Sequence, residues 1–186
     1  MRDKTEQIIK AALDVFIKKG FQVATTQEIA KEAEVAEITL YRKFSTKQNL
    51  FITAVKTVIE KQFNSHVKKL AKAENTEEFL SGIIYNRLEV LSKNASLVKM
   101  LLSESLMGNL AEEINLSTLI FSSLKNGLDI HFDMLNKNVD TAFIARQLGG
   151  IFLSFIILPI EQPFHELDES GKEEVVKKYV KSLVIE

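Results

Sequence analysis

The chain has 186 residues and a formal net charge of −1, with 46% hydrophobic and 26% charged residues. This composition supports a packed core and excludes a disordered chain. No cysteine is present, which excludes disulfides, thiolate metal sites and cysteine nucleophiles. Residues 1–72 hold 14 basic and 8 acidic side chains, a balance of +6, whereas residues 73–186 hold 10 and 17, a balance of −7. A basic first part suits a polyanionic partner, although solvated helix faces produce the same asymmetry.

No segment has the pattern of a secretory signal or of a membrane span. Lys10, Asp14 and Lys18 interrupt the apolar residues near the start of the chain, so these residues do not form a signal-peptide core. The longest apolar run, residues 148–160, is too short to span a bilayer. We therefore expect a soluble, cytoplasmic protein.

Apolar residues recur at intervals of three and four along the chain, and the first proline is Pro159, so the pattern predicts an all-α protein. The first helix is expected over residues 3–19. Gly20 is placed to stop it in a left-handed conformation, and Phe21 can then fold back onto its last turn.

Residues 25–47 predict two short helices joined by a tight turn. Thr25 and Glu28 have the spacing of a capping box, which starts the first helix at Thr26. The second opens after Val35 and ends near Phe44. Helices of about eight residues are too short to be stable alone. Two of them that share apolar residues across a turn are typical of a helix-turn-helix, whose second helix lies in the major groove of DNA.

The remaining apolar stripes predict longer helices. Thr46 is a plausible cap for a fourth helix, and Ser170 with Glu173 forms a capping box for the last one. The expected ranges after the helix-turn-helix are 47–70, 77–92, 96–107, 110–135 with a break near Asn115, 141–158, and a final helix from 170 onward.

The helix-turn-helix segment resembles the tetracycline-repressor (TetR) family of bacterial transcription regulators. Glu34 stands where the family usually has glycine, and Ala36 where it has a hydroxyl cap. Positive φ at Glu34 would cost on the order of 1 kcal/mol, and the missing cap at Ala36 roughly another 1 kcal/mol. The resemblance covers about a quarter of the chain and is carried by Thr26, Ile29-Ala30, Ala33, Val35, Thr39-Leu40-Tyr41, Phe44, Lys47 and Leu50.

The second helix of this pair offers several side chains that could read DNA. Arg42 and Lys43 can reach guanine edges or phosphates, Thr39 a base or a phosphate, and Ile38 a thymine methyl group. Glu37 is either an acceptor from cytosine N4 or a bystander. The alternative is a small three-helix core with a polar exterior.

Four further residues complete the DNA-binding candidates. The resemblance implies that Tyr41 and Lys47 hold phosphates, helped by the N-terminus of the fourth helix. Thr26 and Gln27, at the start of the first short helix, are expected at the DNA backbone or the groove edge.

The resemblance also implies an effector pocket in the C-terminal half. Aromatic and apolar residues at helical spacing are candidates for its lining, and each is equally well explained as plain core. The candidates are Phe63, Tyr85, Leu88, Met100, Glu104, Phe121, Leu124, Gln147 and Phe152.

Two DNA half-sites require two recognition helices related by a two-fold axis, so we expect a homodimer. Residues 141–158 are apolar nearly all round and contain two adjacent glycines, which suits a four-helix bundle between subunits. The alternative is that residues 148–160 form the central core helix of the monomer. The interface candidates are Gly149, Phe155, Val176, Tyr179, Val180 and Leu183.

Catalytic patterns are missing from the sequence. His66, His131 and His165 lack metal-ligand spacing, and no G-x-S-x-G motif occurs. We therefore expect no catalytic site, no metal and no cofactor. The interpretation is a homodimeric transcription regulator, with a DNA-binding part over 1–46 and an effector-binding and dimerisation part over 47–186. It is expected to repress and to be released by a small apolar effector. The alternative is a helical ligand- or partner-binding protein whose helix-turn-helix only serves packing.

Overall fold

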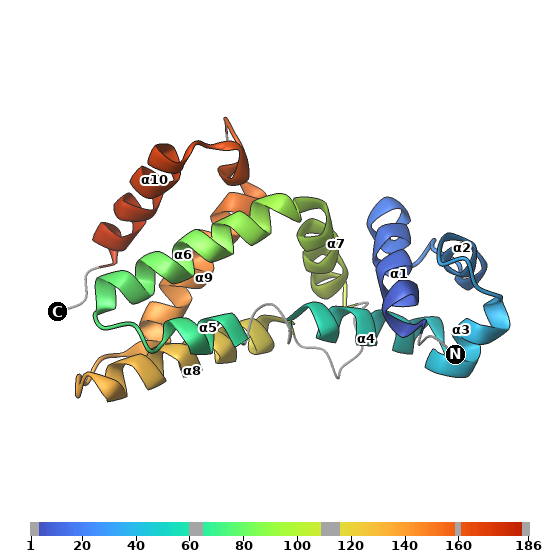
Figure 1. Ribbon diagram of the computed structural model, residues 1–186, viewed down its shortest axis with the longest axis horizontal. Coiled ribbons are helices and arrows are strands. Elements are labelled where there is room, and N and C mark those ends of the chain that lie inside the picture. The colour runs from blue at the N-terminus through green and yellow to red at the C-terminus, as the bar shows by residue number, and fades with distance from the viewer. Residues whose placement is uncertain (1–3, 60–64, 109–115, 159–160, 184–186) are drawn as a thin grey trace. The chain divides into compact units, whose positions relative to one another are not determined.

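The computed structural model describes residues 4–59, 65–108, 116–158 and 161–183. Every regular element in these ranges is a helix, which confirms the all-α prediction (Figure 1). The chain forms two compact units. The first contains residues 1–61 and 99–115, and the second contains residues 62–98 and 116–186.

The first unit is built from four N-terminal helices. They are α1 (Thr5–Lys19), α2 (Thr26–Glu32), α3 (Glu37–Phe44) and α4 (Lys47–Ile59). Helix α1 packs on α2 and α4. Phe16, Phe21 and Phe51 form an aromatic cluster at its centre, with ring centroids 4.7–5.7 Å apart.

Helix α4 therefore shares its core with α1, although the predicted division of the chain lies between residues 46 and 47. As a functional boundary that division stays a prediction. Thr46 caps α4 as expected, because its hydroxyl accepts the Asn49 N–H at 3.0 Å.

Gly20 ends α1, and its N–H donates to the carbonyl of Phe16 at 2.8 Å. The predicted positive φ is confirmed at 77°, but ψ is 161°, which is a mirror-image extended conformation and not the predicted left-handed helical one. Phe21 does fold back, with its ring 5.7 Å from that of Phe16.

The capping box at the start of α2 is confirmed. The Thr25 hydroxyl accepts the Glu28 N–H, and the Glu28 carboxylate accepts the Thr25 N–H, both at 3.2 Å. In the turn, Glu34 has φ 49°. Ala36 is the N-cap of α3 and provides no side-chain hydrogen bond.

The second unit contains α5 (Ser65–Leu70), α6 (Thr76–Lys93), α8 (Leu116–Met134), α9 (Thr141–Ile157), a short 3-10 helix η2 (Phe164–Glu166) and α10 (Glu169–Ser182). Helix α6 packs against α5, α9, η2 and α10, and α8 packs against α5 and α9. Their shared core is apolar and includes Phe79, Ile83, Leu128 and Phe152.

His131 is completely buried in this core. It stacks on Phe79 at 4.3 Å, and its Nδ1 lies 3.1 Å from the carbonyl oxygen of Ala71. Gly127 lies where α5 meets α8, and a Cβ built there would come within 2.2 Å of Val67 Cγ1. The absence of a side chain at Gly127 therefore lets α5 reach its observed position.

Helix α7 (Ala95–Leu106) is divided between the two units. Its residues up to Val98 belong with the second unit, and those from Lys99 onward belong with the first.

Two of the predicted helix boundaries fall on residues outside the described ranges. The single helix predicted over 47–70 is described as α4 and α5, and the prediction for residues 60–64 lies outside the described residues. The break predicted near Asn115 also lies outside them, and α8 is described from Leu116.

The capping box predicted at Ser170 is wrong. Asp168 is the N-cap of α10, and its carboxylate accepts the Gly171 N–H at 2.7 Å. Ser170 instead donates its hydroxyl to Asp168 at 3.1 Å.

Candidate nucleic-acid interface

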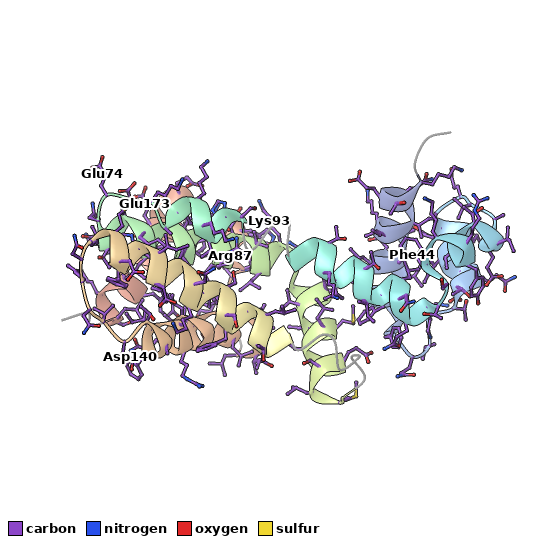
Figure 2. The ribbon with its side chains drawn as sticks, turned by 90° about the horizontal axis from the view of Figure 1, so that it is seen from below. Phe44, Glu74, Arg87, Lys93, Asp140 and Glu173 are labelled. Atoms are coloured by element: carbon purple, nitrogen blue, oxygen red, sulfur yellow. The ribbon has the colours of Figure 1, made fainter. Side chains whose placement is uncertain are left out.

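Helix α3 separates a buried face from an exposed face. Leu40 and Phe44 are buried, and Phe44 is labelled in Figure 2. On the other face Ile38 is 75% exposed and Tyr41 is 44% exposed. Burying an apolar side chain is favourable, so a residue as open as Ile38 is available to a partner surface.

The other candidates lie around these two side chains. Arg42, Lys43 and Gln27 are exposed, whereas Thr39 is half-buried. Lys43 Nζ donates to the hydroxyl of Thr5 at 2.9 Å. Two cations and an apolar side chain on one helix suit contacts to phosphates and to base edges.

Thr26, Glu37 and Tyr41 are joined by hydrogen bonds across α2 and α3. The Thr26 hydroxyl donates to Glu37 Oε1 at 2.6 Å and lies 3.0 Å from Tyr41 Oη. A threonine hydroxyl has one proton, so Tyr41 is the donor in the second bond. In this conformation Glu37 is held against α2, and the Tyr41 proton is directed to Thr26.

The ammonium group of Lys47 is directed at the backbone of the α1–α2 connection. Its Nζ donates to the carbonyl oxygens of Phe21, Gln22 and Ala24 at 2.9, 3.2 and 2.9 Å. It also lies 4.7 Å from the centroid of the Phe21 ring. An ammonium group has three protons, so these carbonyls occupy all of them. Sequence reasoning expected a phosphate ligand and missed this grip on the α1–α2 connection.

An ion pair between Lys19 and Glu28 borders the same connection. The hydrogen bond from Lys19, together with the Thr25 N–H, lowers the pKa of Glu28 below its usual value. Glu28 therefore stays charged while it takes part in the capping box.

Residues 8–54 match the family model described as bacterial regulatory proteins, tetR family. The N-terminal module belongs to the TetR family. The matched segment contains every DNA-binding candidate named from the sequence.

A curated relative is the uncharacterized HTH-type transcriptional regulator YerO of Bacillus subtilis, 37% identical over 82 residues, which are 44% of this chain and 26% of YerO. The chain spans between about a quarter and about half of the length of the first curated relatives that it matches.

Solved structures extend the likeness beyond the TetR module to the whole fold. The fatty acid degradation regulator FadR from Bacillus halodurans has a TM-score of 0.74 at 21% identity, covering 97% of this chain and 94% of that one. FadR from Bacillus subtilis in complex with stearoyl-CoA has a TM-score of 0.68 at 18% identity, covering 97% and 99%. These similarities show that a TetR module and a C-terminal helical part form one known fold.

The structure distributes the effector-pocket candidates over both units. Met100 and Glu104 belong to the unit that contains the TetR module, and Phe63 lies outside the described residues. The other six belong to the second unit. Leu88, Leu124 and Phe152 are buried there, whereas Tyr85, Phe121 and Gln147 are half-buried.

Tyr85 has a defined partner within the second unit. Its hydroxyl donates to Glu169 Oε2 at 2.9 Å, which raises the pKa of Tyr85 above its usual value. Its ring meets that of Phe164 edge-on at 5.6 Å. These contacts tie α6 to η2 and α10.

Sequence reasoning missed Arg87, which is labelled in Figure 2 and is only 3% exposed. Burial lowers the pKa of its guanidinium to about 10. Its Nη2 donates to Asn86 Oδ1. The available signal was its spacing, because Arg87 follows Ile83 and Ile84 at the interval that continues their apolar stripe.

The interface candidates are mostly used within one chain. Val176 and Leu183 are buried in the core of the second unit, so they leave little surface for another subunit. Phe155 and Tyr179 pack on each other at 5.7 Å, and Val180 is half-buried. Around Gly149, nothing lies within 4 Å of a Cβ built there.

Another face of α9 is exposed and apolar. Phe143, Leu153 and Ile157 are 57%, 43% and 62% exposed. Together with the exposed Gly150 they recur at helical spacing, so they form one stripe. We call these four residues the α9 stripe.

Neither a metal-binding cluster nor a membrane-spanning helix is found in the part of the chain that the structure describes. It contains no cluster of three or more His, Cys, Asp or Glu side chains suited to a metal ion. In the same ranges, no helix is both long and apolar enough to cross a membrane.

Proposed function

We propose that this chain is a homodimeric DNA-binding transcription regulator, and that it represses until a small apolar effector releases it from its operator. The observation that carries the proposal is the exposed face of α3. Leu40 and Phe44 bury the other face of this helix, and the exposed side chains are those of Ile38, Tyr41, Arg42 and Lys43. This face lies within the TetR module.

In the proposed complex, α3 enters the major groove. Ile38 meets a thymine methyl group, and Arg42 takes a guanine edge or a phosphate. Tyr41 reaches a phosphate by turning its hydroxyl away from Thr26, whose bond to Tyr41 is 3.0 Å long in the free protein. Thr39 and Lys43 add a base or phosphate contact, while Thr26 and Gln27 approach the DNA backbone from α2.

Lys47 takes a different part in this proposal from the one the family resemblance implies. Since three carbonyls occupy its ammonium protons, it supports binding by holding the connection that precedes α2. A direct phosphate contact would require it to release one of them.

For the dimer, we propose that the α9 stripe faces its copy across a two-fold axis. Its three large side chains are apolar and open, and Gly150 permits a close approach of a second helix. The interface is thereby moved from Val176 and Leu183, which the monomer core already uses.

The effector is proposed to bind within the second unit, near its half-buried aromatic side chains. Phe121 and Tyr85 are partly accessible beside a largely apolar core, which suits a molecule with an apolar part. The B. subtilis FadR neighbour was solved with stearoyl-CoA, whose acyl chain is apolar and whose coenzyme A part is polar and charged.

The test is direct binding to DNA selected by the protein from a random-sequence duplex pool, measured at two salt concentrations. Arg42→Ala is expected to weaken binding by about tenfold or more if it reads guanine, and to relax the preference at one base position. Lys177→Ala removes an exposed cation from α10 and serves as the matched control. If the wild-type protein selects no particular DNA sequence from the pool, the result would favour the alternative, in which the helix-turn-helix only serves packing.

A further inference from the structure

A buried carboxylate on α7 contacts the backbone of the TetR module. Glu104 is 5% exposed, and its Oε1 accepts the N–H of Phe21 at 3.1 Å, across 83 positions of the sequence. Both residues belong to the first compact unit. Burying a carboxylate is costly unless it is hydrogen-bonded, so the buried position of Glu104 depends on bonds such as the one from the Phe21 N–H.

The same short connection is held from α4. Glu104 takes the N–H of Phe21, and Lys47 takes the carbonyl oxygens of Phe21, Gln22 and Ala24. An acidic and a basic side chain thus hold the backbone of Phe21, Gln22 and Ala24. Thr25, the cap of α2, follows at once. This connection leads directly into α2, and α3 packs on α2.

Helix α7 also contains residues of the other unit. It runs without interruption from Ala95, with residues up to Val98 grouped in the second unit and Glu104 in the first. An α-helix is a stiff element because each of its turns is hydrogen-bonded to the next. A displacement of its first turn is therefore carried along the helix to Glu104.

We propose that Glu104 is the positioning residue through which α7 sets the placement of the DNA-reading helices. This inference rests on the proposed function and adds the link that it leaves unspecified. When α7 shifts, the Glu104–Phe21 bond moves or breaks. The α1–α2 connection then loses one of the two side chains that hydrogen-bond its backbone, and the Thr25 cap and α2 move with it.

Linkage between two sites is reciprocal, so DNA bound to the TetR module must in turn affect α7. The experiment compares amide hydrogen exchange with and without a duplex oligonucleotide that the wild-type protein has selected from a random pool. Three proteins are used: the wild type, Glu104→Ala, which removes the acceptor, and Glu104→Gln, which removes the charge but keeps an acceptor oxygen.

In the free proteins, we expect the Phe21 amide to exchange about tenfold faster or more in Glu104→Ala than in the wild type. Glu104→Gln should stay close to the wild type. On adding DNA, residues 99–106 of the wild type and of Glu104→Gln should gain protection. Glu104→Ala should bind the DNA without that gain in α7.

A gain in α7 protection that persists in Glu104→Ala would overturn the inference. So would wild-type protein that binds the DNA yet shows no change in α7, and this arm decides the matter even if Glu104→Ala does not fold. A wild-type protein that binds no DNA refutes the proposed function itself, and that outcome is read from the binding curve rather than from exchange.

Discussion

Among the three residues of the TetR module with positive φ, Gly20, Glu34 and Ser45, the first two lie in the connections on either side of α2. Gly20 has φ 77° and ψ 161°, a conformation that is essentially restricted to glycine. Glu34 has φ 49° in the turn between α2 and α3. Both positions could be identified from the sequence, one by its glycine and the other by comparison with the family pattern. The ψ of Gly20 could not, because packing of Phe21 against Phe16 and Phe51 sets the direction of the chain after it.

Replacing Glu34 by glycine should stabilise the protein by on the order of 1 kcal/mol, because glycine adopts positive φ without a Cβ clash. The matched control is Glu32→Gly, which places the same substitution at the end of α2, where the backbone is right-handed. It should destabilise the protein by up to about 1 kcal/mol. Urea unfolding of the three proteins measures both changes. A less stable Glu34→Gly protein would mean that the Glu34 side chain contributes more than its backbone costs.

Other single residues show where sequence reasoning stops. The pattern located Lys47 at the start of a helix, but it could not show that three carbonyl oxygens 23 to 26 positions earlier would meet its ammonium group. Arg87 was likewise hidden, since a periodic pattern reports where apolar residues lie and not which charged residue replaces one of them. Both contacts depend on distances between elements, which only tertiary packing fixes.

At the scale of elements, the helix starts marked by capping residues were the most predictable feature. The starts at Thr26 and Lys47 are as expected, because a hydroxyl three residues before an amide favours one local geometry. The segment from Asp168 to Glu173 offers two such starts, and the structure uses the earlier one. Its surroundings explain the choice: Leu167 packs against the core, and Glu169 accepts the Tyr85 hydroxyl.

The Asp168 cap predicts a pH dependence of stability. The Gly171 N–H, and next the Ser170 hydroxyl, hold the pKa of Asp168 below its ordinary value. A carboxyl whose folded pKa is depressed stabilises the fold above its unfolded pKa, and this contribution is lost as the pH falls through the folded pKa. Asp168→Ala should therefore lower the Tm at neutral pH, and its difference from the wild type should shrink below pH of about 3.9.

Ser170→Ala is the control for this pair, because it changes the residue first expected to cap α10. It should lower the Tm less than Asp168→Ala at neutral pH, since it removes only a donor to the Asp168 carboxylate. Thermal melts followed by circular dichroism, at neutral pH and below pH of about 3.9, give the Tm of each variant relative to the wild type. A larger fall in Tm for Ser170→Ala than for Asp168→Ala would indicate that Ser170, and not Asp168, caps α10.

At the scale of the whole molecule, fold class and the TetR module followed from the sequence, whereas the grouping of the later helices did not. Leu88, Leu124 and Phe152 were predicted equally as pocket lining or as plain core, and the structure buries all three. Apolar periodicity could not assign Met100 and Glu104 to the unit that holds the TetR module. Periodicity describes one helix at a time, so it cannot show which faces of distant helices come together.

Assembly can be tested on the α9 stripe. Leu153→Glu places a charge in its middle and should give folded, monomeric protein, because a buried unpaired carboxylate opposes association. Leu106→Glu is the matched control, since Leu106 is an exposed leucine on α7. It should leave the mass unchanged. Sedimentation equilibrium distinguishes the two, and a Leu153→Glu protein with the mass of the wild-type dimer would place the interface elsewhere.

The tight fit between Gly127 and Val67 ties the evolutionary freedom of two positions together. A Cβ at position 127 would lie 2.2 Å from Val67 Cγ1, and a β-branched side chain has few other rotamers to adopt. Position 127 therefore cannot gain a side chain while Val67 keeps its size and its place. We therefore expect that a descendant of this chain with alanine at position 127 acquired a smaller residue at position 67 beforehand. The order of these two substitutions follows from the close packing of α5 on α8.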